Sequence, residues 1–115
     1  MSGISSHVLD TARGVPAEGM QIDLYRIEGD NWAKLRTVVT NSDGRVDGAL
    51  LGSAEMAAGH YELVFHFGKY LRDSAGVEAP FLDLVPIRFG VVDVAAHYHV
   101  PLLISPFGYT TYRGS

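Results

Sequence analysis

Hydrophobic and polar residues alternate along several short stretches of the chain. Every second position is apolar at Tyr61, Leu63, Phe65 and Phe67, and the same period of two recurs over residues 87–91. A β-strand places successive side chains on opposite faces, so this period is typical of a strand with one buried face. Both stretches are therefore predicted to be strands.

Further strands are expected around two tight turns. Residues 20–27 alternate in the same way, and residues 32–40 are rich in the β-branched and aromatic side chains that suit a pleated surface. Residues 28–31 are predicted to form the turn between them, and residues 41–44 the next turn, because Asn and Gly favour chain reversal. The remaining predicted strands are 4–9, 45–50, 98–104 and 109–113.

One stretch favours a helix. Residues 69–75 are followed by Gly76, a typical helix end, but the stretch is too short to be stable without packing against a sheet. About eight short strands separated by Gly and Pro predict an all-β fold, an antiparallel β-sandwich. A chain of 115 residues, 47% of them hydrophobic, can bury one core, so we expect a single domain over residues 1–115.

The predicted strand over 98–104 is apolar on both faces. Its apolar residues are Val100, Leu102 and Ile104 on one face and Pro101 and Leu103 on the other. A two-layer sandwich covers only one face of each sheet, so the second apolar face requires cover from another molecule. We therefore expect a homo-oligomer.

Charge and composition exclude several classes of function. Nine basic and 13 acidic residues lie scattered and give a net charge of -4, so no basic patch indicates nucleic-acid binding. The absence of cysteine excludes thiolate nucleophiles and cysteine-ligated metals. No apolar stretch is long enough to span a bilayer, and residues 1–7 lack the features of a signal peptide. We expect no membrane partner and a cytoplasmic protein, or a periplasmic one if an export signal has been removed.

Five histidines are candidates for proton transfer, since imidazole titrates near neutral pH. His60 and His66 share a strand face with Glu62, a pattern typical of a solvated face, and we expect no function there. His97 and His99 are two residues apart and share a face, a spacing that can present two imidazoles to one metal ion.

A zinc site at His97 and His99 would need a third ligand. His7 is a candidate, but there is no His-Glu-x-x-His helix and no tight acidic cluster. A serine nucleophile is not indicated either, because the chain has no Gly-x-Ser-x-Gly motif. A zinc hydrolase is thus a disfavoured alternative, and we expect no metal and no cofactor.

Three segments carry a more specific pattern. They are Ser6-His7-Val8-Leu9-Asp10-Thr11-Ala12, Thr40-Asn41-Ser42-Asp43-Gly44-Arg45, and a last segment that starts at His97 and ends in Tyr112-Arg113-Gly114-Ser115. Together they resemble the 5-hydroxyisourate hydrolases of the transthyretin-like family, whose hallmarks are an N-terminal His-Val-Leu-Asp, a central Gly-Arg and a C-terminal Tyr-Arg-Gly-Ser. The resemblance covers the whole chain.

The resemblance implies both a fold and an activity. The fold is that of transthyretin, a β-sandwich of two four-stranded sheets with one short helix, assembled as a homotetramer from two dimers. The activity is the hydrolysis of 5-hydroxyisourate to 2-oxo-4-hydroxy-4-carboxy-5-ureidoimidazoline in urate degradation, without a cofactor. The active site would lie in clefts at the dimer–dimer interface, at positions that match His7, Arg45, His99, Tyr112 and Ser115.

The chemistry of these side chains suits that reaction. His7 and His99 would take a proton from water and protonate the departing ring nitrogen, and the sequence leaves open which is base and which is acid. Arg45 would bind carbonyl and ring-nitrogen acceptors with its planar fork of donors. Tyr112 would place its ring and hydroxyl against the flat substrate, and Ser115 would contribute its hydroxyl or the terminal carboxylate.

Two non-enzymatic alternatives remain. A transthyretin-type carrier would hold a small hydrophobic ligand in the same channel and perform no chemistry, and a β-sandwich adaptor would act only through protein contacts. His7, His99 and the terminal tetrapeptide favour the enzyme over both.

Overall fold

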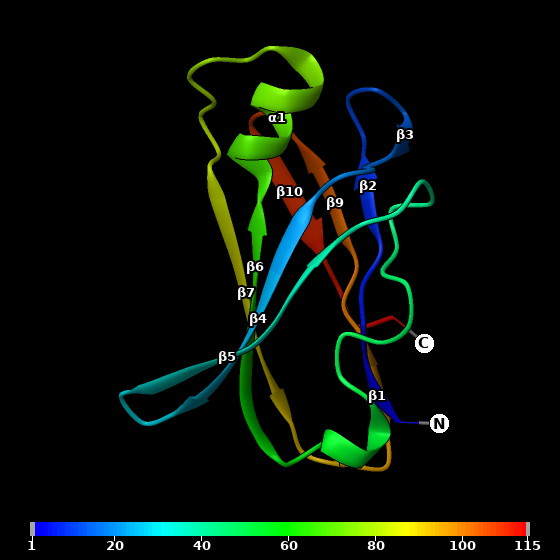
Figure 1. Cartoon of the computed structure of the whole chain (residues 1–115), viewed down its shortest axis with the longest axis vertical. Coiled ribbons are helices and arrows are strands. Elements are labelled where there is room, and N and C mark those ends of the chain that lie inside the picture. The colour runs from blue at the N-terminus through cyan, green and yellow to red at the C-terminus, as the bar shows by residue number, and fades with distance from the viewer. Residues whose placement is uncertain (1, 115) are drawn as a thin grey trace.

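The computed structural model describes residues 2–114, which form two four-stranded β-sheets packed face to face (Figure 1). One sheet has the strand order β5-β4-β6-β7 and is antiparallel throughout. Its strands are β4 (Gln21–Glu28), β5 (Asn31–Val39), β6 (Gly59–His66) and β7 (Leu84–Val91). The second sheet has the order β10-β9-β2-β3. Its strands are β2 (Val8–Asp10), β3 (Val15–Pro16), β9 (Leu102–Ser105) and β10 (Gly108–Thr111).

Two further strands form a two-stranded sheet of their own. β1 (Gly3–Ser5) and β8 (His97–His99) pair in parallel, and β2 and β9 also pair in parallel. The N-terminal segment and the segment that follows β7 thus run side by side, although they are far apart in the sequence (Figure 1). The predicted all-β sandwich with two four-stranded sheets is confirmed, but these two parallel pairings depart from the antiparallel prediction.

Two long predicted strands are each interrupted once. The first appears as β1 and β2 and the second as β8 and β9, with a break at Pro101, which has no N–H to donate. Backbone hydrogen bonds continue across the interruption. The N–H of Val100 donates to the carbonyl of Ser5 over 2.9 Å, and that of Leu102 donates to the carbonyl of His7 over 2.9 Å. His7 is therefore held by backbone pairing although it lies between two strands.

The strand predicted over residues 45–50 is wrong, because β-pairing within this described stretch is limited to a single bridge between Arg45 and His7. Gly48 has a φ of +76°, which turns the chain out of the extended conformation. The segment is consequently a loop, and its one β-bridge lies at the candidate site.

The helix α1 (Phe67–Ala75) begins two residues before the predicted start. It ends at Gly76, whose φ of +67° is the left-handed conformation that glycine adopts readily. The Tyr70 hydroxyl donates to Oδ2 of Asp10 over 2.8 Å, which fixes the helix to β2. A short 3-10 helix, η1 (Ser53–Glu55), precedes β6. Within residues 2–114 neither helix has the length and hydrophobicity of a membrane-spanning segment.

The core lies between the two sheets. Strands β4 and β6 contribute Ile22, Leu24, Leu63 and Phe65, each with no exposed surface, and β9 contributes its share through Leu102. Truncating one such side chain to Ala typically costs about 2–5 kcal/mol. The alternating positions that predicted these strands are thus the ones that hold the layers together.

The outward face of β6 is less solvated than its sequence indicates. Glu62 is only 8% exposed and accepts a hydrogen bond from Nε of Arg88 over 3.1 Å. His66 is half-buried, and its Nε2 lies 2.8 Å from Oδ2 of Asp23. His60 is exposed, as predicted. The prediction of a solvated face is therefore wrong for Glu62 and His66, which are covered by neighbouring polar side chains.

The second apolar face of the 98–104 segment is also partly covered within one chain. Pro101 is buried and Leu103 is half-buried, so the predicted strip of both residues in water is wrong for Pro101. Exposed apolar surface lies elsewhere, at Phe81 and Phe107, which are 72% and 80% exposed. Their ring centroids are 6.0 Å apart, and they form one patch.

Candidate active site

The turn at residues 41–44 brings Arg45 beside His7. Oδ1 of Asn41 accepts hydrogen bonds from the N–H groups of Asp43 and Arg45, at 2.9 and 3.1 Å. Gly44 has a φ of +73°, and a Cβ added there would lie only 2.3 Å from a backbone oxygen of β2. The turn therefore requires glycine at this position, and the Gly-Arg pair of the sequence motif has a structural basis.

The imidazole of His7 is oriented by the same turn. Its Nε2 lies 2.9 Å from the carbonyl oxygen of Asp43. A carbonyl oxygen only accepts hydrogen bonds, so Nε2 of His7 carries the proton. In the neutral ring the lone pair is then on Nδ1, which is free to act as a base.

His97 and His99 lie on the same face of β8, as their spacing predicts, and both contact one serine. Ser5 is the register partner of His99 in the parallel β1–β8 pair. Its Oγ lies 2.8 Å from Nε2 of His97 and 2.8 Å from Nδ1 of His99. The two rings are nearly parallel, with centroids 6.5 Å apart, so the hydroxyl connects them where they do not reach one another.

The C-terminal segment returns to His99. The N–H of Gly114 donates to the carbonyl of His99 over 2.8 Å. A Cβ added to Gly114 would lie 2.5 Å from Cδ2 of the His99 ring, so the glycine permits close contact with the imidazole. Residues up to Gly114 are thus anchored at the candidate site and do not form a frayed tail.

The electrostatic environment disfavours a charged His99. Burial lowers the pKa of His99 below its usual range, and the positive charge of Arg45 lowers it further. The backbone pairing brings these residues together, since Ser5 is the register partner of His99 and His7, two residues further along, bridges to Arg45. His99 is consequently neutral at physiological pH.

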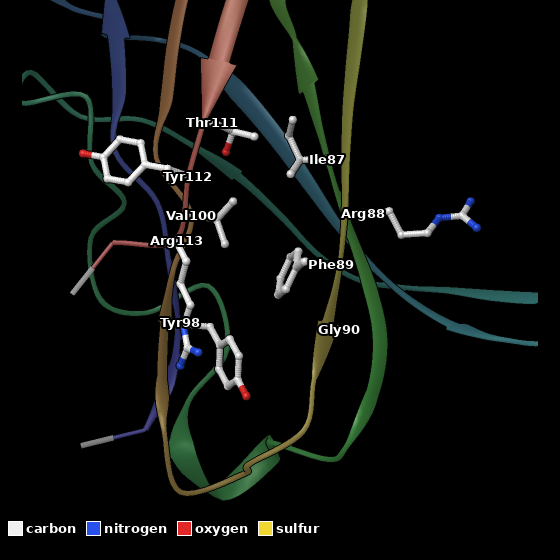
Figure 2. Close-up of a pocket in the computed structure, with 9 residues that line it drawn as sticks. All are labelled: Ile87, Arg88, Phe89, Gly90, Tyr98, Val100, Thr111, Tyr112 and Arg113. Carbon is white, nitrogen blue, oxygen red and sulfur yellow. The ribbon is translucent and has the colours of Figure 1, made fainter.

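A separate cavity lies beside the same tail (Figure 2). It has a volume of about 290 Å³ and lies between β7 and the segments that contain Val100 and Thr111. In Figure 2 the Tyr112 ring points away from Phe89, and the guanidinium of Arg113 lies over the ring of Tyr98, 4.3 Å from its centroid. Of the predicted site residues Tyr112 lines this cavity, whereas His7, Arg45 and His99 do not.

The donor set for a metal ion is poor. Across residues 2–114 no group of three or more His, Asp or Glu side chains is arranged to hold a metal ion. His97 and His99 instead use one nitrogen each to contact Ser5.

The structure brings together three of the predicted site residues, His7, Arg45 and His99, with Gly114 of the terminal motif. Tyr112 is 57% exposed and lies two residues before the contact of the tail with His99. The predicted role of Ser115 concerns a residue outside the described range.

Sequence reasoning missed two partners of the histidines, the hydroxyl of Ser5 and the carbonyl of Asp43. Ser5 precedes His7 by two positions, a spacing that would place both on one side of the predicted strand over 4–9. Its contact with His99 depends on the parallel β1–β8 pairing, which no local pattern reveals. A carbonyl oxygen has no sequence signal at all.

Comparison with known proteins places this geometry in a family. Residues 4–114 match the model of the HIUase/Transthyretin family. A protein named 5-hydroxyisourate hydrolase 2 from Rhizobium meliloti is 64% identical, over 97% of this chain and 95% of its own length. The solved structure of Klebsiella pneumoniae 5-hydroxyisourate hydrolase is 39% identical over all of both chains, with a TM-score of 0.84. Sea bream transthyretin in complex with thyroxine is 26% identical over 96% of this chain and 93% of its own, with a TM-score of 0.86.

The chain belongs to the HIUase/Transthyretin family. Its backbone matches the hydrolase and the transthyretin about equally well, but its sequence is much nearer to the hydrolases. Within the family it is therefore a hydrolase, and its fold alone would not have made this distinction.

Proposed function

We propose that this chain hydrolyses 5-hydroxyisourate to 2-oxo-4-hydroxy-4-carboxy-5-ureidoimidazoline, a step of urate degradation. The observation that carries the proposal is the gathering of His7, Arg45 and His99 at one place, with His99 held neutral. The identity to proteins named 5-hydroxyisourate hydrolase supports the choice of substrate.

The reaction requires addition of water to a ring carbonyl and cleavage of the adjacent C–N bond. An imidazole takes a proton from the attacking water, and a proton is returned to the departing nitrogen, which leaves a carboxylate and a ureido group. Arg45 is exposed at the site and offers five N–H donors in a plane. These donors suit the carbonyl and ring-nitrogen acceptors of the substrate and the negative charge that develops on oxygen.

Tyr112 and Ser115 complete the proposed site. The N–H of Gly114 donates to the carbonyl of His99, so the described end of the segment that follows Tyr112 lies beside this histidine. The Tyr112 ring, exposed in the single chain, would cover one face of the flat substrate. Ser115 would contribute its hydroxyl or the terminal carboxylate.

We further infer that the site is completed by assembly into a homotetramer. The exposed patch of Phe81 and Phe107 is apolar surface that self-association would bury. Light scattering at micromolar concentration should give the mass of four chains. A fully active monomer would contradict the inference.

The decisive experiment records the decay of freshly generated 5-hydroxyisourate with and without the purified protein. We expect accelerated decay that persists after treatment with a chelator, because two imidazoles and a guanidinium meet the chemical need. Loss of activity on chelation with recovery on addition of zinc would replace this mechanism with a metal site at His97 and His99. Decay at the uncatalysed rate would reject the proposed activity.

A further inference from the structure

Ser5 is the one side chain that contacts both imidazoles of β8 within the described residues, and the mechanism above does not use it. Its Oγ is 2.8 Å from Nε2 of His97 and 2.8 Å from Nδ1 of His99. A hydroxyl has one proton and two lone pairs, so Ser5 donates to one ring and accepts from the other when both rings are neutral. The direction of this pair of hydrogen bonds decides which nitrogen of His99 carries a proton.

The other nitrogen of His97 indicates the direction. Nδ1 of His97 is buried and has no hydrogen-bond partner among residues 2–114. If Ser5 donated to His97, the proton of His97 would be on Nδ1, as a buried N–H without a partner. If Ser5 accepts from His97, the proton is on Nε2, and Nδ1 is only an unused acceptor. Buried N–H groups without a partner are the rarer and more costly case, so the second arrangement is favoured.

We propose that Ser5 is a positioning residue that accepts a hydrogen bond from Nε2–H of His97, donates its own proton to Nδ1 of His99, and thereby presents the Nε2–H of His99 to the substrate. The proposal deepens the proposed function and rests on it for the meaning of that N–H group. The neutral state of His99, favoured by burial and by the charge of Arg45, is the state that this arrangement requires.

This arrangement divides the work between the two histidines of the site. The Nε2 of His7 donates to the carbonyl of Asp43, so its Nδ1 has the lone pair and is the base that takes the proton from water. That proton then passes from His7 to the departing nitrogen. The Nε2–H of His99 donates a hydrogen bond to the oxygen on which negative charge develops, as a neutral imidazole can do when its other nitrogen is already occupied.

The test compares Ser5→Thr with Ser5→Val, which have the same shape and differ only in the hydroxyl. Ring nitrogens of ¹⁵N-histidine-labelled protein report directly by NMR which nitrogen of His99 is protonated. In the wild type and in Ser5→Thr we expect the proton on Nε2, and in Ser5→Val a mixture of the two tautomers. Ser6→Ala is the control, because the neighbouring Ser6 hydroxyl donates to the carbonyl of Val100 and contacts neither imidazole.

Activity supplies the second measurement. Relative to Ser5→Thr, we expect Ser5→Val to lose about ten- to a hundredfold in kcat with little change in KM, the size of effect seen when a group that orients a functional imidazole is removed. Equal kcat values for the two variants would overturn the positioning role.

The NMR result separates failure of this proposal from failure of the proposed function. A wild-type His99 protonated on Nδ1, or a tautomer unchanged in Ser5→Val, would overturn the role of Ser5 even in an active hydrolase. If Ser5→Val does not fold, the tautomer of His99 in the wild-type spectrum still tests the role of Ser5. A protein without activity on 5-hydroxyisourate, but with Nε2-protonated His99 that depends on the hydroxyl, would reject the function and retain the hydrogen-bond arrangement.

Discussion

Two histidines of this molecule have opposite electrostatic surroundings. His66, on β6, contacts a carboxylate, with Nε2 2.8 Å from Oδ2 of Asp23. His99, on β8, has the positive charge of Arg45 in its surroundings and shares the hydroxyl of Ser5 with His97. Both rings are half-buried, so burial alone does not distinguish them.

The difference shows what separates a structural imidazole from one suited to contact with a substrate. In His66 a carboxylate already occupies Nε2, so this nitrogen is not available to a substrate. Burial and then the charge of Arg45 lower the pKa of His99 and favour its neutral form, so its N–H stays available for a substrate. The sequence presents both as one His on a β-strand, and only their partners distinguish them.

The largest effect expected from this comparison is on turnover. His99→Asn and His7→Asn should each lower kcat by about two to four orders of magnitude, the usual share of a positioned acid or base. Steady-state kinetics with 5-hydroxyisourate measures the loss, and circular dichroism checks that the fold is retained.

His66→Asn and His60→Asn are the matched controls for these variants. Both remove an imidazole from a strand of the other sheet, and kcat should stay within about threefold of the wild type, since neither residue lies near His99. Equal losses in all four variants would mean that the surroundings of a histidine do not predict its role.

A smaller loss is expected when the tail is pushed away from His99. Gly114→Ala places a Cβ where it would lie 2.5 Å from Cδ2 of the ring, so either the tail or the imidazole must shift. Because a displacement of about 1 Å at a catalytic group can cost on the order of a hundredfold, we expect a ten- to hundredfold lower kcat/KM at unchanged thermal stability.

Gly108→Ala is the control in the same part of the chain, because a Cβ added there meets nothing within 4 Å. Full activity of Gly114→Ala would show that the contact between the tail and His99 is not needed for the reaction. The same outcome would weaken the roles proposed for Tyr112 and Ser115.

Much of the fold follows from local patterns in the sequence. The alternation over residues 61–67 and 20–27 reproduces β6 and β4, and the Asn-Ser-Asp-Gly turn lies where predicted, because period and turn chemistry act over a few residues. The strand over 45–50 failed because Gly48 turns the chain, and the split of the predicted strands 4–9 and 98–104 follows from Pro101 and from pairing with distant segments.

The candidate site was less predictable than the fold. His7, Arg45 and His99 were found through the family resemblance, since each is an ordinary surface position when judged alone. The contact of Ser5 with His99 joins residues 94 positions apart through a parallel pairing, which local patterns do not encode. The burial of Glu62 and His66 was missed because it arises from cross-strand partners.

The structural role of His66 can be tested at its carboxylate partner, Asp23. Burial raises the pKa of Asp23, but hydrogen bonds from His66, Thr37 and Gln21 outweigh it, and the pKa is lowered overall. Asp23→Asn should lower the free energy of unfolding at neutral pH by about 1–3 kcal/mol, the usual cost of leaving buried partners unsatisfied. Urea unfolding monitored by circular dichroism measures this change.

The pH dependence of the free energy of unfolding provides the control for Asp23→Asn. A lowered pKa means that the Asp23 carboxylate stabilises the folded state above the pKa of the unfolded chain, about 3.9, and that the stabilisation disappears as the pH falls through the folded value. The difference between wild type and Asp23→Asn should therefore shrink on acidification below about pH 4. A constant difference at all pH values would indicate lost packing and not a lost charge.

The smallest expected effect is on the pKa of His99 itself. Burial is the largest cause of its lowering and Arg45 is the next, so Arg45→Gln removes one positive charge and leaves burial in place. The pKa of His99 should rise but stay under the influence of burial, and an NMR titration of the ring proton on Cε1 measures the change.

The pH dependence of activity should shift in the same direction as the pKa of His99. If neutral His99 is the active form, activity is lost as the pH falls through the pKa of His99, and a raised pKa moves this acidic limb of kcat/KM to higher pH. Arg88→Gln, which removes a guanidinium that pairs with Glu62 on the other sheet, should leave the limb where it is. Arg45→Gln will also lower the rate at every pH because the substrate loses the guanidinium N–H donors. The test therefore reads the pH at which activity falls and not the maximal rate. If neither the acidic limb of kcat/KM nor the pKa of His99 changes in Arg45→Gln, solvent and salt screen Arg45 from His99. The contrast with His66 would then rest on burial and hydrogen bonding alone.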